Sequence, residues 1–313
     1  MQACGCQPFL KQIVIMAFCL FLSFPESPVR AQQATASKPG TAHVLIVVGP
    51  STHAPGTHEV LAGGRLIKYC CEQLNLEGVK VEATLSEGWP RDKELLAKID
   101  TVVFTGDRFP LAELKDKQGM QQLSQMMQSG CGIVCFHYAT GLNASQVPED
   151  GDHPLLKWMG GYFATKCKHH QSIARIFREA EIKPAAVKHP VLRGVVPFKI
   201  YDEPYINNYF GPNGMAGNVT ALATSMLPPE NPKKEVVAWA TERQDGGRGM
   251  GVVMPHFYQN WEVEPLRKLI LNAVVWTAKE EVPKQGVQVQ LHGLAKFEPE
   301  RVEMPERFKV PKK

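Results

Sequence analysis

The sequence has little net charge and no cluster of basic residues. Its 35 Lys and Arg residues against 31 Asp and Glu residues give a formal charge of +4, and the two signs are interspersed along the chain. A nucleic-acid partner is therefore not indicated, because proteins that bind nucleic acids concentrate positive charge on one surface. The chain also lacks a dinucleotide-binding fingerprint, a Walker motif and internal repeats. The glycine-rich stretch 246–249 precedes an apolar strand instead of opening a helix, which predicts a hairpin turn and not a phosphate-binding loop.

Cysteine is too scarce and too irregularly spaced for a disulfide framework or a zinc knuckle. Beyond residue 31 the chain has five cysteines, an odd number that lies mostly within apolar stretches: Cys70, Cys71, Cys131, Cys135 and Cys167. This distribution favours small buried hydrophobic side chains over disulfides.

An apolar run long enough to span a membrane is also absent. Residues 13–24 are apolar, but the stretch is shorter than a typical span and lies close to the N-terminus. Val29-Arg30-Ala31 then provides the small residues that signal peptidase requires. An uncleaved anchor is the competing interpretation, and the Val-x-Ala site favours cleavage. We therefore expect a signal peptide at 1–31, export to the periplasm or the extracellular space, and a mature protein without a stable membrane span.

Strand-like and helix-like patterns alternate in the first half of the chain. Strands are predicted at 43–49, 79–85, 100–105 and 132–136, and helices between them at 58–76, 91–98 and 110–129. This order predicts a parallel sheet with right-handed crossovers.

Beyond residue 150 the pattern becomes less regular. We expect a short helix at 153–163, antiparallel strands at 172–177, 220–224 and 235–241, long loops at 178–219, a buried strand at 249–254 and an amphipathic helix that begins at Pro265. The expected organisation is a linker at 32–42 after the signal peptide, one α/β domain at 43–280, and an extended C-terminal tail at 281–313.

Four of the apolar strands lead to polar residues that can take part in catalysis. In chain order these residues are His53, Asp107, His137 and His256. In an open parallel sheet, ligands bind outside the carboxyl ends of the strands. We therefore expect the four side chains to line one crevice, which favours a protein that acts on a small molecule.

Five stretches of the chain form a family signature. They are GCGIVCFHYATG (130–141), WMGGYF (158–163), HPVLRGV (189–195) followed by YDEPY (201–205), VVAWATERQDGGRGMGVVMPHFYQNW (236–261) and LILNAVVWTAK (269–279). Together they resemble the ThuA-like (trehalose utilisation) family, and in particular its exported members from planctomycete-type bacteria. The resemblance implies a flavodoxin-like, class I glutamine amidotransferase-like α/β fold, with a mostly parallel sheet and helices on both faces. It also implies a role in carbohydrate catabolism, with a sugar, a 3-keto-sugar or a glycoside as the small-molecule partner.

The resemblance places His137 where amidotransferase-like folds carry their nucleophile, on the turn after a strand. A glutaminase needs a cysteine at that position, because a thiolate attacks the amide carbon. Cys135 falls two residues earlier, inside the strand, so a degenerate amidotransferase is disfavoured. His256 lies in the family's histidine motif, although Pro255 replaces the usual glycine and restricts the backbone before the histidine.

The catalytic set predicted in this way is His137, His256 and the carboxylates of YDEPY, Asp202 and Glu203, with Glu203 favoured as the inward-facing group. The residues expected to bind substrate are His53, Asp107, Tyr205, Tyr258 and His170. Tyr258 also fits core packing, and His58 fits the opening of a helix. No cofactor is indicated. Two histidines and a carboxylate can bind a divalent metal, but a local ligand spacing such as H-x-x-x-H is absent, so metal binding stays open.

These residues are suited to proton transfer near neutral pH. We interpret the chain as an enzyme that acts on a sugar or 3-keto-sugar by acid–base chemistry, through hydrolysis, isomerisation or β-elimination. The alternative is a non-catalytic sugar-binding protein with the same crevice.

Overall fold

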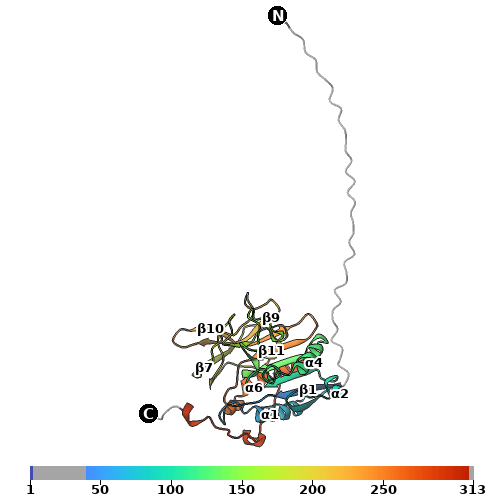
Figure 1. Ribbon diagram of the computed structural model, residues 1–313, viewed down its shortest axis with the longest axis vertical. Helices are drawn as coiled ribbons and strands as arrows, with labels where there is room; N and C mark the ends of the chain where they lie inside the picture. The colour runs from blue at the N-terminus through green and yellow to red at the C-terminus, as the bar shows by residue number, and fades with distance from the viewer. Residues whose placement is uncertain (3–39, 310–313) are drawn as a thin grey trace. The chain divides into compact units, whose positions relative to one another are not determined.

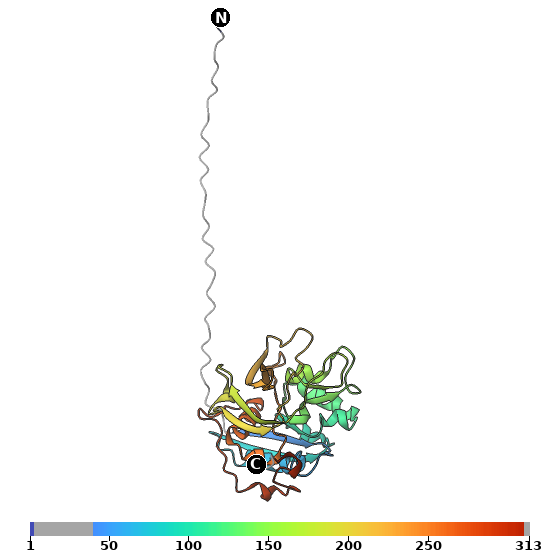
Figure 2. The ribbon, with the colours of Figure 1, turned by 90° about the vertical axis from the view of Figure 1, so that its left-hand side faces the viewer.

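The computed structural model describes residues 1–2 and 40–309, and Figures 1 and 2 show it from two directions. The expected signal peptide, except for its first two residues, and nearly all of the expected linker lie outside this part of the chain. Within the described residues, no helix is both long and apolar enough to cross a membrane.

A nine-stranded mixed sheet with the order β2-β1-β3-β4-β11-β10-β9-β7-β8 forms the centre of the fold. The strands are β1 (Gly40–Val48), β2 (Val79–Glu87), β3 (Thr101–Thr105), β4 (Gly132–Phe136), β7 (Phe177–Pro184), β8 (Phe198–Asp202), β9 (Val219–Leu227), β10 (Lys233–Glu242) and β11 (Arg248–Val252). Neighbours from β2 to β11 run parallel, and neighbours from β11 to β8 run antiparallel. The parallel half has the strand order of a flavodoxin-type doubly wound sheet, which confirms the predicted α/β fold.

Helices cover both faces of the parallel half (Figure 1). They are α1 (Val60–Glu72), α2 (Lys93–Leu96), α3 (Pro110–Glu113), α4 (Lys117–Gln128), α5 (Pro154–Met159) and α6 (Glu264–Thr277); a separate two-stranded sheet is formed by β5 (Gly141–Asn143) and β6 (Phe163–Thr165). Helices α1 and α6 pack against each other on one face. On the other face α5 approaches β11 so closely that a Cβ on Gly249 would lie 2.0 Å from the carbonyl oxygen of Trp158.

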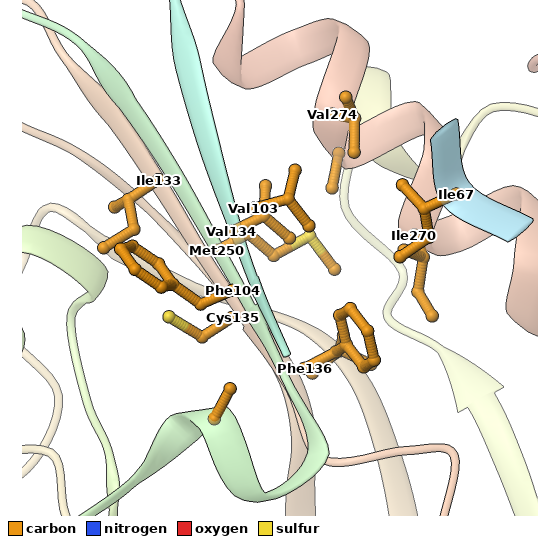
Figure 3. Close-up of a cluster of buried hydrophobic side chains, with 14 of the residues drawn as sticks. Ile67, Val103, Phe104, Ile133, Val134, Cys135, Phe136, Met250, Ile270 and Val274 are labelled. Atoms are coloured by element: carbon orange, nitrogen blue, oxygen red, sulfur yellow. The ribbon is translucent and has the colours of Figure 1, made fainter. Parts of the chain in front are cut away.

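The core lies on both sides of the sheet, as Figure 3 shows. Val103, Val134 and Met250 face α6, where Ile270 and Val274 lie. On the opposite side the figure shows Phe104, Ile133 and Cys135, which are also fully buried. Strands that are buried on both faces read as continuous apolar runs, which explains why the sequence located them correctly.

Three elements differ from the sequence-based expectation. The single helix expected at 110–129 is divided into α3 and α4, because Lys115 adopts a left-handed conformation with a φ of 54°. The strand expected at 172–177 is reduced to one isolated bridge between Ile173 and Ile206, and β7 begins only at Phe177. Strand β8 and all of β7 after Phe177 lie inside the segment 178–219 that was expected to form loops. The five residues of β8 are too few for a clear alternating pattern.

The order of the strands creates a crevice at the carboxyl ends of β1 and β3. The chain passes from β1 through α1 to β2 on one side, and from β3 through α3 and α4 to β4 on the other. Loops that leave adjacent strands in opposite directions leave a crevice at such a switch point. Because β4 and β11 continue the parallel half, their following loops reach the same edge of the sheet.

The described part of the expected C-terminal tail, 281–309, contains no β-strand and consists of extended stretches with the short 3₁₀ turns η4 (Leu294–Phe297) and η5 (Glu306–Phe308). It packs on the domain through six buried side chains, Val282, Val287, Leu294, Phe297, Met304 and Pro305. Arg65 of α1 forms an ion pair with Glu298, and Figure 1 shows this segment in red beside α1.

Candidate active site

The loops that follow β1, β3, β4 and β11 bring their polar residues together, as the sequence predicts. His53 and His58 follow β1, Asp107 follows β3, His137 follows β4, and His256 follows β11. The ring centroids of His58, His137 and His256 are 4.5 to 5.1 Å apart. Residues that are far apart in the sequence therefore form one compact imidazole cluster.

His137 occupies a strained position directly after β4. Its φ of 49° lies in the left-handed region, which residues with a Cβ adopt rarely and mostly at functional sites. The buried ring has Nδ1 3.3 Å from the carbonyl oxygen of Val253. A carbonyl oxygen only accepts, so Nδ1 carries the proton and Nε2 is left with a lone pair.

His58 is oriented by the carboxylate of Asp107. Its Nδ1 lies 2.7 Å from Asp107 Oδ1, and His53 Nδ1 lies 2.9 Å from the same oxygen. The backbone N–H of Thr52 donates to Asp107 Oδ2 at 2.6 Å. Because the carboxylate accepts from Nδ1 of His58, Nε2 of that ring also presents a lone pair. The rings of His53 and His58 are stacked, with centroids 3.6 Å apart.

His256 is positioned through its backbone. Asp202, which is completely buried at the end of β8, accepts the backbone N–H groups of His256 at 2.8 Å and of Phe257 at 3.2 Å. Burial raises the pKa of Asp202 to about 7, although these hydrogen bonds oppose the shift. These contacts position the backbone of the His256 loop, and the catalytic role of Asp202 stays a prediction. The peptide bond between Met254 and Pro255 is cis.

Three imidazole nitrogens meet at one point. His58 Nε2 lies 2.8 Å from His137 Nε2 and 2.9 Å from His256 Nδ1, and the last two atoms are 3.1 Å apart. The nitrogens of His58 and His137 both present lone pairs, because the other nitrogen of each ring is used by Asp107 or Val253. Two acceptors this close repel each other unless a positive centre lies between them.

The three nitrogens fit a divalent cation. Zinc binds neutral imidazoles at about 2.0–2.1 Å, and an ion at that distance from all three nitrogens would sit just above the triangle that they form. The acceptors behind His58 and His137, a carboxylate and a carbonyl, are the usual partners of metal-binding histidines. His53, His58 and Asp107 form a second close group of possible ligands. Its geometry is explained more simply by Asp107 holding both rings.

Glu203 and Tyr205 lie beside the three nitrogens. Glu203 Oε2 is 3.4 Å from His256 Nδ1 and 3.9 Å from His137 Nε2, and the hydroxyl of Tyr205 is 2.9 Å from His137 Nε2. Tyr138 contacts the rings of His53 and Tyr205 from the next position along the chain after His137. Glu203 therefore faces the centre, as the sequence analysis favours.

Burial keeps the clustered histidines neutral. It lowers the pKa of His58 to about 4 and that of His256 to about 2, and it holds the pKa of His137 well below its usual value. Burial, with the neighbouring Asp202, raises the pKa of Glu203 to about 8. Burial alone would raise the pKa of Asp107, but the hydrogen bonds from His53 and His58 lower it by more, so the net shift is downward. Neutral imidazoles are the form that binds metal.

Six of the predicted site residues lie together: His137, His256, Glu203, His53, Asp107 and Tyr205. Two predicted substrate-binding residues do not join them. His170 is directed to the carbonyl oxygen of Asn207 at 2.6 Å, and the buried Tyr258 donates to the carbonyl oxygen of Leu294 at 3.1 Å.

Sequence reasoning missed two members of the site. His58 was expected to open a helix, but the N-cap of α1 is Glu59, and His58 lies at the centre of the cluster. Its place in the loop after β1, which already contained His53, was the available signal. Tyr138 gave no signal of its own. Cys135 is fully buried in β4, where burial raises its pKa well above the usual value.

The comparisons with known proteins concern the family and the fold. The sequence model of the family described as "ThuA: Trehalose utilisation" matches residues 43–277. A search of curated protein sequences found no match. Among solved structures, a ThuA-like protein from Bacteroides uniformis is similar with a TM-score of 0.53 at 16% identity, over 80% of this chain and 96% of that one. A ThuA-like protein from Parabacteroides merdae gives 0.52 at 14% identity, over 80% and 98%. These two likenesses show the shared fold, and the family match over most of the sequence shows that the chain belongs to the ThuA family.

Proposed function

We propose that this protein is an enzyme of carbohydrate catabolism that acts on a sugar or keto-sugar at a divalent cation held by His58, His137 and His256. The observation that carries the proposal is the meeting of three imidazole nitrogens at 2.8 to 3.1 Å, two of them with lone pairs that face each other. The family supports a carbohydrate as the substrate class.

A divalent cation at this place would act as a Lewis acid toward a carbonyl or hydroxyl oxygen of the sugar. Two further groups beside the imidazoles are suited to moving protons. Glu203 lies beside His256 and His137. His53 is stacked on His58, and its Nδ1 is held by Asp107, so its Nε2 is the nitrogen left to exchange a proton with a substrate. The side chain of His53 is 31% exposed, which gives it access to solvent.

This arrangement suits chemistry next to a ketone, where the α-proton is acidic. In the proposed reaction Glu203, whose raised pKa makes its ionised form a stronger base than an ordinary carboxylate, removes that proton. The C–H electron pair forms a double bond to the carbonyl carbon, and the carbonyl π pair moves onto its oxygen. The imidazolium form of His53 supplies the Nε2 proton. In β-elimination this proton goes to the glycosidic oxygen that leaves as the enolate electrons reform the carbonyl; in isomerisation it goes to the former carbonyl carbon, while the α-hydroxyl passes its proton to the former carbonyl oxygen and becomes the new carbonyl. Tyr205, whose hydroxyl reaches His137, completes the wall of the site on the Glu203 side.

The test combines metal analysis with turnover. The purified full-length protein should contain about one equivalent of a divalent metal by inductively coupled plasma mass spectrometry. Turnover of a 3-keto-glycoside should disappear after chelation and return when the metal is restored. His137→Asn should remove both metal and turnover while the protein still melts cooperatively, because asparagine tolerates the left-handed backbone at this position.

Glu203→Gln separates the two parts of the proposal. It should retain the metal and lose turnover, because the amide cannot accept the substrate proton. A metal-loaded protein that binds the sugar without converting it would support a sugar-binding protein instead. Full turnover by the metal-free protein would show that the three histidines act without a cation.

A further inference from the structure

The C-terminal segment 300–309, which lies beyond the family match at 43–277, is anchored to two of the three loops that supply the clustered histidines, those of His58 and His256. The Glu59 carboxylate accepts the backbone N–H groups of Gly56, Glu300 and Arg301 at 2.7 to 3.1 Å. This contact ties the segment to the loop that carries His53 and His58. The fit is tight, since a Cβ on Gly56 would lie 2.2 Å from the carbonyl oxygen of Glu303.

The same segment also contacts the loop of His256. The side-chain oxygen of Gln259 accepts the backbone N–H of Met304 at 3.2 Å. The hydroxyl of Tyr201 donates to the carbonyl oxygen of Phe308. The ring of Phe308 packs edge to face on Phe257, with centroids 5.4 Å apart, and lies 6.2 Å from the ring of His256. Phe308 is thus fixed next to His256, at the edge of the imidazole cluster.

Arg307 rests on this anchored ring. Its guanidinium carbon lies 4.6 Å from the centroid of Phe308, and among the described residues it forms no ion pair or side-chain hydrogen bond. Arg307 is exposed. A guanidinium presents several N–H donors in a planar fork that matches paired oxygen atoms.

We propose that Arg307, positioned by Phe308, is a specificity-determining residue that binds paired oxygens of the substrate beyond the sugar ring at the histidine cluster. The inference rests on the proposed function and names its substrate class more closely. The paired oxygens belong either to neighbouring hydroxyls of a second sugar ring or to a carboxylate on the reacting sugar. Both are recognised by the same fork of donors.

The experiment compares Arg307→Gln and Phe308→Ala with Arg301→Gln, a matched charge change on the same segment whose side chain makes no contact with the cluster. Three substrates separate the two sources of oxygen: a 3-keto-disaccharide, the corresponding 3-keto-monosaccharide and a uronate. Calorimetric binding of the unoxidised disaccharide and of the uronate provides a readout that does not need turnover. Metal content and thermal melts exclude loss of the fold or of the cation.

Arg307→Gln should raise KM for the preferred substrate on the order of 10-fold or more with a much smaller change in kcat, because hydrogen bonds to a charged group are lost. Phe308→Ala should act in the same direction, and Arg301→Gln should behave like the wild type. If the wild type binds the sugar without turnover and Arg307→Gln weakens that binding, the proposed catalysis fails and this inference stands. If the wild type turns over its substrate and Arg307→Gln keeps the same KM, the inference is overturned. A wild type that neither binds nor converts these sugars overturns both.

Discussion

Asp107→Asn tests the idea that the histidine cluster is a metal site in which Asp107 orients His58 through its Nδ1. Asp107 receives donors on both oxygens. The Nδ1 atoms of His58 and His53 lie 2.7 and 2.9 Å from Oδ1, and the backbone N–H and the hydroxyl of Thr52 donate to Oδ2 at 2.6 and 3.2 Å. An ionised carboxylate satisfies all four. An asparagine side chain has only one accepting oxygen, so its NH₂ group must face either the N–H of Thr52 or the two imidazoles.

The magnitude follows from this mismatch. Replacing a group that orients a metal-binding histidine typically weakens metal binding about 10- to 100-fold, or roughly 1.4 to 2.7 kcal/mol. The donor left facing the amide adds a cost of about 1 to 3 kcal/mol to the stability of the fold. We therefore expect Asp107→Asn to lower zinc affinity by one to two orders of magnitude while His58 still reaches the cluster.

The assay is a competition titration of zinc against a chromophoric chelator at pH 7, together with thermal melts of the metal-free and zinc-loaded protein. Asp116→Asn is the matched control, since Asp116 caps α4 and pairs with Arg91 far from the cluster. This control should bind zinc like the wild type. An Asp107→Asn protein whose zinc affinity stays within about twofold of the wild type would refute the reasoning that Asp107 orients a metal ligand.

Three further predictions concern other parts of the chain. Cys135→Ser should leave turnover largely intact, since the thiol is buried in β4 and not at the cluster. It should lower the free energy of unfolding, measured by chemical denaturation, by about 1 to 2 kcal/mol. Loss of activity in a variant that melts like the wild type would make the thiol the nucleophile. Burial lowers the pKa of His153 from 6.5 to about 4, so protonation of this residue favours the unfolded chain. The folded state therefore has about 3 kcal/mol of stability from this residue above pH 6.5, and it loses that stability as the pH falls toward 4. His153→Asn retains an acceptor for the N–H of Leu155 at the start of α5. Its free energy of unfolding, measured at pH 7, 5.5 and 4.5, should therefore depend less on pH than that of the wild type. An unchanged pH dependence would contradict the assignment of this effect to His153. N-terminal sequencing of the protein from its native bacterium should begin near Gln32, and an intact Met1 in the soluble cytoplasm would end the export prediction.

Much of the site was predictable because topology, and not side-chain detail, brings it together. Strands β1, β3, β4 and β11 could be read from apolar runs, and parallel neighbours end at one edge of a sheet. That argument alone places His53, Asp107, His137 and His256 side by side. It could not rank the residues within a loop, which is why His58 was assigned to the helix that begins two residues later.

The groups supplied by β8 and by the C-terminal segment were harder to place from sequence. Glu203 and Tyr205 follow the edge strand of the antiparallel half, and only the contact between Asp202 and the backbone of His256 brings that loop to the cluster. The segment that carries Arg307 and Phe308 reaches the site through hydrogen bonds from its own backbone to Glu59 and Gln259. Backbone hydrogen bonds of irregular segments leave no periodic pattern in a sequence, so their partners cannot be read from it.

The turn after β4 explains how this fold can support a different chemistry without rearrangement of the sheet. A left-handed residue directly after a buried strand lifts one side chain out of the core and presents it at the carboxyl edge, whatever that side chain is. A thiol at this position would be a nucleophile for an acyl group. The imidazole of His137 instead directs Nε2 to the nitrogens of His58, which follows β1, and of His256, which follows the neighbouring strand β11. The identity of this one residue therefore decides whether the turn provides a nucleophile or the third nitrogen of a cation-binding cluster.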